Sequence, residues 1–298
     1  MVDPVIYQPG LINPVRKIGG RTFDFAHQIA IMGIVNRTPD SFHDRGRTFA
    51  LDAAIEAVQK AIADGADWID IGGVPFAPGP EVTVAEELDR VIPVVEAARA
   101  ASDVVISVDT YRAEVAARAI EAGADVINDT SGLHDPQMAS LVASTDAYLV
   151  ITHSLAAPRT PLPRPTYRDV VKEVADFLQR RAELAIERGM PAERIIIDPG
   201  HDLNKNTYHS LELTRRLNEI TALPYPVLVA VSNKDFIGET LDRQQHDRLE
   251  GTLATVVVCV LRGARIVRVH DVRAAVAAVR MTEAIMGYRP PAYTRHNM

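Results

Sequence analysis

GADWID, residues 65–70, indicates the fold class, because related segments occur twice more, as GADVIN at 123–128 and GARIVR at 263–268. Each copy reads as a glycine that ends a helix, then a short apolar strand, then a polar residue. The repeated feature is therefore one strand–helix unit. The pattern predicts an α/β protein with a parallel sheet.

Short runs rich in Val and Ile recur along the chain and are separated by longer segments with helical periodicity. We expect strands at residues 29–35, 67–71, 104–108, 125–128, 147–152, 195–198, 227–231 and 266–269, with helices between them, for example at 51–64 and 168–188. Eight strands, each followed by a helix, in about 250 residues predict a (β/α)8 barrel of the TIM type. A doubly wound sheet is the alternative.

The barrel is expected to span residues 29–288, with an N-terminal extension at 1–28 and a C-terminal tail at 289–298. The longest irregular stretch is residues 156–166, which contains four prolines. A loop of this length is the best candidate for a cover over a site.

Composition limits the possible partners. The chain has 298 residues, 47% of them hydrophobic and 24% charged, and a formal net charge of −7. That charge argues against nucleic acid or an anionic membrane as a partner. The single cysteine, Cys259, lies in an apolar run and reads as a buried thiol. The N-terminus resembles no secretion signal and no apolar run approaches the ~20 residues of a membrane span, so we expect a soluble cytoplasmic protein.

Polar side chains follow the predicted strands, and in a barrel such strand ends meet at one mouth, where ligands bind. These residues are Asn36, Asp70, Asp109, Asn128, His153, Asp198, Ser232, Lys234, Arg268 and His270. Acceptors from the carboxylates and donors from Lys234 and Arg268 would together suit a flat heterocycle with a ring carbonyl and N–H groups. His153, His201, His209 and His270 are scattered and form no zinc pattern, and no G-x-S-x-G elbow occurs.

Six segments in the order and spacing seen here resemble the dihydropteroate synthase family. They are residues 32–42 (MGIVNRTPDSF), 106–110 (ISVDT), 127–132 (INDTSG), 196–200 (IIDPG), 232–234 (SNK) and 268–271 (RVHD). The resemblance implies a (β/α)8 barrel, usually homodimeric, that joins a pterin to p-aminobenzoate in folate synthesis. The pterin donor is a hydroxymethyl-dihydropterin diphosphate, and its diphosphate leaves with the help of Mg²⁺.

The resemblance also assigns roles to positions of this chain. The pterin would be held by Asp109, Asn128, Asp198 and Lys234, with Arg268 stacked on its ring. Asn36 would assist Mg²⁺ and the diphosphate. Arg268 and His270 would contact the diphosphate, so that Lys234, Arg268 and His270 are the candidate catalytic residues.

One loop departs from the family pattern. Where the family reads Gly-Glu-Ser-Thr-Arg-Pro-Gly, this chain has Gly73, then Val74, Pro75, Phe76 and Ala77, then Pro78-Gly79. The framing residues and the loop length are unchanged, whereas all four interior polar residues are absent. Each preorganised donor that stabilises a leaving group raises the catalytic rate by about 10²–10³. The loss of these donors therefore predicts that the synthase rate falls by about 10³ or more.

Other departures lie nearby. Asn233 and Asp235 flank Lys234 where the family has arginine and serine, Leu203 falls on an aromatic position, and His153-Ser154 replaces His-Met. Arg37, His43 and Arg45 of the first loop are cations where small residues are common; they could restore charge, bind another anion or simply face solvent.

Three functions remain open at this point. The preferred one is a dihydropteroate synthase homologue that keeps the pterin pocket but is inactive, or nearly so, in the synthase reaction. The second is a working synthase with a remodelled loop, using p-aminobenzoate or an analogue. The third is another pterin-dependent transferase, such as a methyltransferase.

Overall fold

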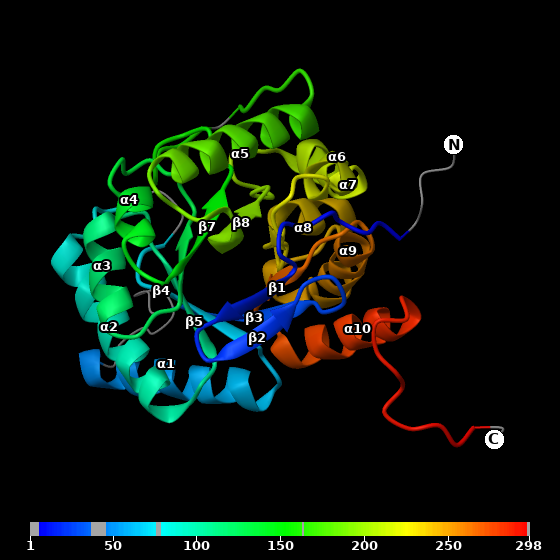
Figure 1. Ribbon diagram of the computed structural model, residues 1–298, viewed down its shortest axis with the longest axis horizontal. Coiled ribbons are helices and arrows are strands. Elements are labelled where there is room, and N and C mark those ends of the chain that lie inside the picture. Colours follow the sequence, from blue (N-terminus) through cyan, green and yellow to red (C-terminus); the bar gives the residue numbers. More distant parts are fainter. Residues whose placement is uncertain (1–5, 37–45, 76–78, 163, 297–298) are drawn as a thin grey trace.

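The computed structural model describes residues 6–36, 46–75, 79–162 and 164–296, with the backbone alone for 46–50. Eight parallel strands form the central sheet, and helices surround it (Figure 1). The strands are β3 (Ala30–Asn36), β4 (Trp68–Gly72), β5 (Val105–Asp109), β6 (Val126–Asp129), β7 (Tyr148–Thr152), β8 (Ile195–Asp198), β9 (Leu228–Val229) and β10 (Ile266–Val269). The helices are α1 (Gly46–Ala63), α2 (Val84–Ala101), α3 (Ala113–Glu121), α4 (Met138–Ala143), α5 (Val170–Glu187), α6 (Thr207–Arg215), α7 (Leu217–Thr221), α8 (Asp235–Leu241), α9 (Leu249–Leu261) and α10 (Val272–Ile285).

The sheet closes on itself. Its strand order is β8-β7-β6-β5-β4-β3-β10-β9, and a parallel bridge between Ile197 and Val227 joins the first and last strands. The predicted (β/α)8 barrel is confirmed, and the doubly wound alternative is excluded. The β-strands are buried on both faces, which explains why they read as continuous apolar runs rather than alternating ones.

The repeated glycines have the expected backbone conformation. Gly65, Gly123 and Gly263 follow α1, α3 and α9 with φ of 98°, 112° and 100°. Only glycine adopts such values without strain, so each of these glycines ends its helix and returns the chain to the next strand. The ninth strand is shorter than predicted, at Leu228–Val229, because the chain turns after Ala230 and Lys234 N–H donates to the Val231 carbonyl over 3.4 Å.

The N-terminal segment contains an antiparallel hairpin, β1 (Val15–Ile18) and β2 (Arg21–Asp24), that lies across one end of the barrel (Figure 1). Ile18 and Phe23 pack with Trp68 inside the barrel, in a cluster separate from the core between strands and helices. The buried Arg265 holds the hairpin by donating to the Phe25 carbonyl over 2.7 Å. The hairpin therefore forms the floor of the barrel, opposite the strand ends that carry the polar residues.

Candidate functional site

Arg268, on β10, lies at the centre of the polar mouth and contacts two carboxylates. Its Nε lies 2.6 Å from Asp70 Oδ2 and its Nη2 lies 3.3 Å from Asp109 Oδ2. Asp70, in the middle of β4, is fully buried, and it also accepts from Ser107 Oγ over 2.5 Å. Two successive strands, β4 and β5, are thus joined to β10 by one network across the mouth.

Asn128 belongs to this network, and its side-chain oxygen is unpaired among the described residues. Its Nδ2 donates to Asp70 Oδ2 over 3.2 Å, while its buried Oδ1 has no hydrogen-bond partner in the described part of the chain. Buried polar atoms are almost always paired, so an unpaired acceptor at the mouth points to a ligand N–H group.

Asp198 supplies a second buried acceptor, at the end of β8. Its Oδ1 accepts from Gly200 N–H over 2.7 Å. Burial raises the pKa of Asp198 to about 6, and this shift is opposed by the Gly200 N–H and by the charge of Lys234. Burial likewise raises the pKa of Asp109 to about 7, against the attraction of Arg268. Both carboxylates are ionised at pH 8 and would gain from ligand N–H donors.

Lys234 and His270 occupy the other side of the mouth. Burial lowers the pKa of Lys234, against the attraction of Asp202 and Asp198. His270 Nδ1 lies 2.9 Å from Ser232 Oγ, at the exposed rim. Arg268 interacts with the charges of Asp70, Asp109 and Asp198 and with that of Lys234, so these predicted residues share one mouth.

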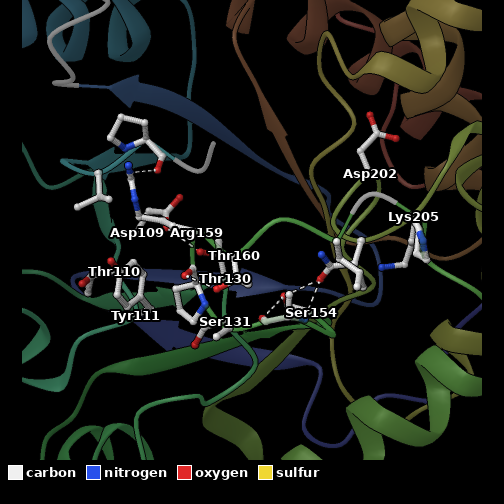
Figure 2. Close-up of a pocket in the computed structure, with 18 of the residues that line it drawn as sticks. Asp109, Thr110, Tyr111, Thr130, Ser131, Ser154, Arg159, Thr160, Asp202 and Lys205 are labelled. Carbon is white, nitrogen blue, oxygen red and sulfur yellow. Dashed lines mark hydrogen bonds between the residues drawn. The ribbon is translucent and has the colours of Figure 1, made fainter. Parts of the chain in front are cut away.

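Two cavities open at the mouth, one lined by Arg268 and the other by its partner Asp109. One, here called the lysine cavity, has a volume of about 310 Å³ and is lined by Ile34, Asp202, Leu203, Ala230, Ser232, Asn233, Lys234, Asp235, Gln245, Arg268 and His270. The other, here called the loop cavity, has a volume of about 250 Å³ and contains Val74, Pro75, Asp109, Thr110, Tyr111, Thr130, Ser131, Ser154, Arg159, Asp202 and Lys205 in its wall. Figure 2 shows Asp202 and Lys205 at one end of the loop cavity and Tyr111 and Arg159 at the other.

The altered loop contributes an apolar wall to the loop cavity through Val74 and Pro75. Phe76 and Ala77 lie outside the described residues, as do Arg37, His43 and Arg45 of the first loop. Arg159, from the segment between β7 and α5, donates to the Pro75 carbonyl over 2.7 Å and to the Pro80 carbonyl over 2.9 Å. The two loops are therefore joined by one guanidinium group.

Lys205 is an internal support of this region. Its Nζ contacts His153 Nδ1 at 2.9 Å and donates to the Gly200 and Leu203 carbonyls over 2.8 and 2.9 Å. Burial, with help from Lys205, lowers the pKa of His153 to about 2, so the imidazole is neutral and accepts the hydrogen bond. His153 therefore fixes the loop after β8 rather than facing a ligand.

Asn36 is the one residue predicted to contact a metal. It is the exposed last residue of β3, and across Gly72 it shares a register line with Asp109. No group of three or more His, Cys, Asp or Glu side chains suited to a metal occurs in the described ranges. Mg²⁺ needs only one or two protein oxygens when substrate phosphates and water complete its shell, so the donor set fits Mg²⁺ only in that form.

Sequence reasoning placed Asp70 among the polar residues of the mouth but gave it no role there. It also missed Arg159, Tyr111 and Asp202. Asp202 had a signal, since it lies in an irregular, polar segment directly after a strand, and its φ of 63° marks a tight turn.

The fold and the mouth define a class of protein: a (β/α)8 barrel with a polar, acceptor-rich ligand site at the strand ends. The chain belongs to the pterin binding enzyme family, whose model matches residues 32–270.

Known relatives agree with this assignment. The chain is 48% identical over 270 residues to a Mycobacterium tuberculosis protein named inactive dihydropteroate synthase 2, covering 89% of this chain and 85% of that protein. It is 40% identical over 264 residues to the Bacillus subtilis dihydropteroate synthase, with 88% and 90% covered. The structure of Xanthomonas albilineans dihydropteroate synthase with 4-aminobenzoic acid superposes with a TM-score of 0.85 at 38% identity, covering 92% of this chain and 98% of that one.

No helix of the described residues has the length and apolar character needed to cross a membrane.

Proposed function

We propose that this chain is a dihydropteroate synthase homologue that binds a pterin at the barrel mouth and is inactive, or nearly so, in joining it to p-aminobenzoate. The observation that carries the proposal is the contrast between the two halves of the mouth. The unpaired Asn128 Oδ1 lies in an acceptor network, whereas Val74 and Pro75 give the adjoining cavity an apolar wall. The name of the mycobacterial relative supports the inactive assignment over the two alternatives.

The pterin would lie against the acceptors of β5, β6 and β8. Asp109, Asn128 and Asp198 would accept its ring N–H groups, and Lys234 would donate to a ring acceptor. Arg268, held by Asp70, would lie against the ring face. An anchored guanidinium is suited to this because it stacks on planar rings as well as pairing with carboxylates.

The diphosphate end of the substrate would meet Arg268 and His270, with Asn36 as a single oxygen ligand to Mg²⁺. When bound, Mg²⁺ would neutralise charge on the departing diphosphate. Pro75 has no backbone N–H, and neither Val74 nor Pro75 has a side chain that can donate a hydrogen bond to that group. Departure of the diphosphate is therefore poorly stabilised, which would account for low activity even with the pterin bound.

Assembly as a homodimer and a cytoplasmic location are part of this proposal. Support for a dimer comes from α9 and α10, which pack together and leave Val258, Met281 and Ile285 40%, 63% and 66% exposed. Neighbouring exposed apolar side chains mark protein–protein contacts more often than isolated ones do.

Steady-state assays with hydroxymethyl-dihydropterin diphosphate and p-aminobenzoate test the proposal, run beside the Bacillus subtilis synthase. We expect at least about 10³-fold lower activity from this chain, because the loop donors are absent. Changing Val74, Pro75, Phe76 and Ala77 together to Glu, Ser, Thr and Arg should raise the activity. The control, with Val74, Pro75 and Phe76 changed to alanine, loosens the loop without adding donors and should not.

Ordinary synthase turnover by the unaltered chain would overturn the inactive assignment and favour a working enzyme with a remodelled loop. Calorimetry with a simple pterin separately tests recognition. A chain that binds no pterin would contradict the pterin half of the proposal, whatever the assay finds.

A further inference from the structure

Thr152, the last residue of β7, carries a buried hydroxyl group that no contact described so far uses. The residue is 1% exposed, and its Oγ1 has no hydrogen-bond partner in the described part of the chain. Asn128 Oδ1 is the other unpaired atom at the polar strand ends. Buried hydroxyl groups are usually paired, so an unpaired one beside a ligand site needs an explanation.

The side chain of Thr152 faces the interior of the barrel. Val150 packs with Trp68 in the cluster inside the barrel, whereas Ile151 belongs to the core between strands and helices. Successive side chains of a strand point to opposite faces, so Thr152 points the same way as Val150. His153 then points outwards, in agreement with its ring contact to Phe177 at 4.7 Å.

Thr152 lies next to one of the acceptors of the mouth. It is the register partner of Asp198 on β8, and register partners on parallel strands place their side chains side by side on the same face. Asn128 is the register partner of Val150, one inward-facing position deeper along β7. A ligand that donates to both Asp198 and Asn128 therefore passes Thr152.

A hydroxyl group adds a donor where the mouth has many acceptors. Asp109, Asn128 and Asp198 offer acceptor oxygens to a ligand, whereas the guanidinium of Arg268 is already paired with two carboxylates. A threonine hydroxyl can donate one hydrogen bond and accept others. The ring nitrogens and the carbonyl oxygen of a pterin are acceptors that need such a donor.

We infer that Thr152 is a further ligand-binding residue of the mouth, and that its hydroxyl donates to a ring nitrogen or carbonyl oxygen of the pterin beside the group that Asp198 accepts. The inference rests on the proposed function. In the free protein the unpaired hydroxyl destabilises the fold, because a buried polar group has lost water and gained no partner. Thr152 therefore lowers stability in exchange for recognition.

Thr152→Val tests both sides of this exchange, because valine keeps the shape of threonine and removes the hydroxyl. Calorimetry at pH 8 with a simple pterin should show about three- to tenfold weaker binding, the effect of one lost hydrogen bond. Urea denaturation without the pterin should show a higher midpoint than that of the unaltered chain. Thr152→Ser, which restores the hydroxyl, should bind the pterin within about twofold of the unaltered chain.

Thr221→Val is the matched control, at a threonine that is also buried. Thr221 Oγ1 donates to the Arg262 carbonyl over 2.7 Å, so its hydroxyl is paired within the protein. The same chemical change should here lower the urea midpoint, since it leaves a carbonyl without this donor, and should leave the pterin affinity within about twofold.

Two results would overturn the inference while leaving pterin binding in place. One is equal pterin affinity of Thr152→Val and the unaltered chain. The other is a urea midpoint that falls in Thr152→Val as it does in Thr221→Val, which would show that the hydroxyl has a partner within the protein. Absence of pterin binding by the unaltered chain would instead overturn the proposed function, and the inference with it.

Discussion

Arg268 Nε lies 2.6 Å from Asp70 Oδ2, a carboxylate with no exposed surface, at the centre of the barrel mouth. Asp70 therefore holds the guanidinium that we assign to the pterin ring in place before a ligand binds. Ser107 and Asn128 donate to the same carboxylate, so three donors converge on it. Asp70 therefore connects β4 to β5, β6 and β10 within the site.

Asp70→Asn should destabilise the fold strongly. The substitution replaces an acceptor oxygen by an amide that opposes the converging donors and leaves the Arg268 charge with less compensation. Removing one partner of a buried ion pair lowers the free energy of unfolding by about 3–5 kcal/mol. Urea denaturation measures this change in the free energy of unfolding.

Asp109→Asn is the comparison, because Asp109 is 26% exposed and, within the described ranges, accepts from Arg268 and Thr130 over 3.3 and 3.2 Å. Its effect should be less than half that of Asp70→Asn. Equal losses of stability would mean that Asp70 has no special place in the network.

Asp198→Asn should stabilise the protein at pH 8 while weakening pterin binding. Burial raises the pKa of Asp198 from 3.8 to about 6, so the unfolded chain ionises this group at a lower pH than the fold does. The folded state therefore loses stability between pH 3.8 and 6, and the full penalty is present above pH 6. The neutral amide removes that penalty and can still accept from Gly200. We expect a gain of about 1–3 kcal/mol in the free energy of unfolding at pH 8.

The gain should fade as the pH is lowered through 6 and be absent near pH 4, where the wild-type carboxyl is protonated in the fold. Denaturation at pH 4, 6 and 8 follows it, and calorimetry at pH 8 should show at least about tenfold weaker pterin binding from the lost acceptor. A variant less stable than the parent at pH 8 would contradict the assignment of a buried, disfavoured charge.

Arg159 should control the motion of both loops that it joins. Its φ of 58° makes glycine the replacement that keeps the backbone and removes the guanidinium. Arg159→Gly should speed hydrogen exchange about tenfold or more at residues 79–83 and 154–160, because both hydrogen bonds to the altered loop are lost. Mass spectrometry after hydrogen exchange measures the exchange rates of both segments.

Arg164→Ala, at an exposed arginine in the same loop, is the control and should leave exchange at residues 79–83 unchanged. Unaltered exchange in Arg159→Gly would show that the loops are held by other contacts.

Much of the fold could be predicted from local pattern. The apolar runs predict the strands, and the glycines at 65, 123 and 263 predict helix ends. Both depend on short-range rules, so the barrel and the residues at its mouth could be predicted from them. The hairpin had a local signal too, in the Gly19-Gly20 turn between two short runs, but its place inside the barrel depends on packing with Trp68.

The contacts within the site were harder to foresee. That Arg268 pairs with Asp70, and not with another strand-end carboxylate, depends on side-chain direction across a closed barrel. Arg159 reaches Pro75 across 84 positions of chain, a pairing set by the path of an irregular loop. The lysine cavity likewise becomes visible only when the loop after β8, the segment after β9, α8 and β10 are placed together.

The hairpin floor bears on how the site is reached. Ile18 and Phe23 are buried with Trp68 and fill the far end of the barrel. A ligand on the strand-end acceptors would therefore be approached from the mouth, and a second molecule bound nearer the surface would slow its release.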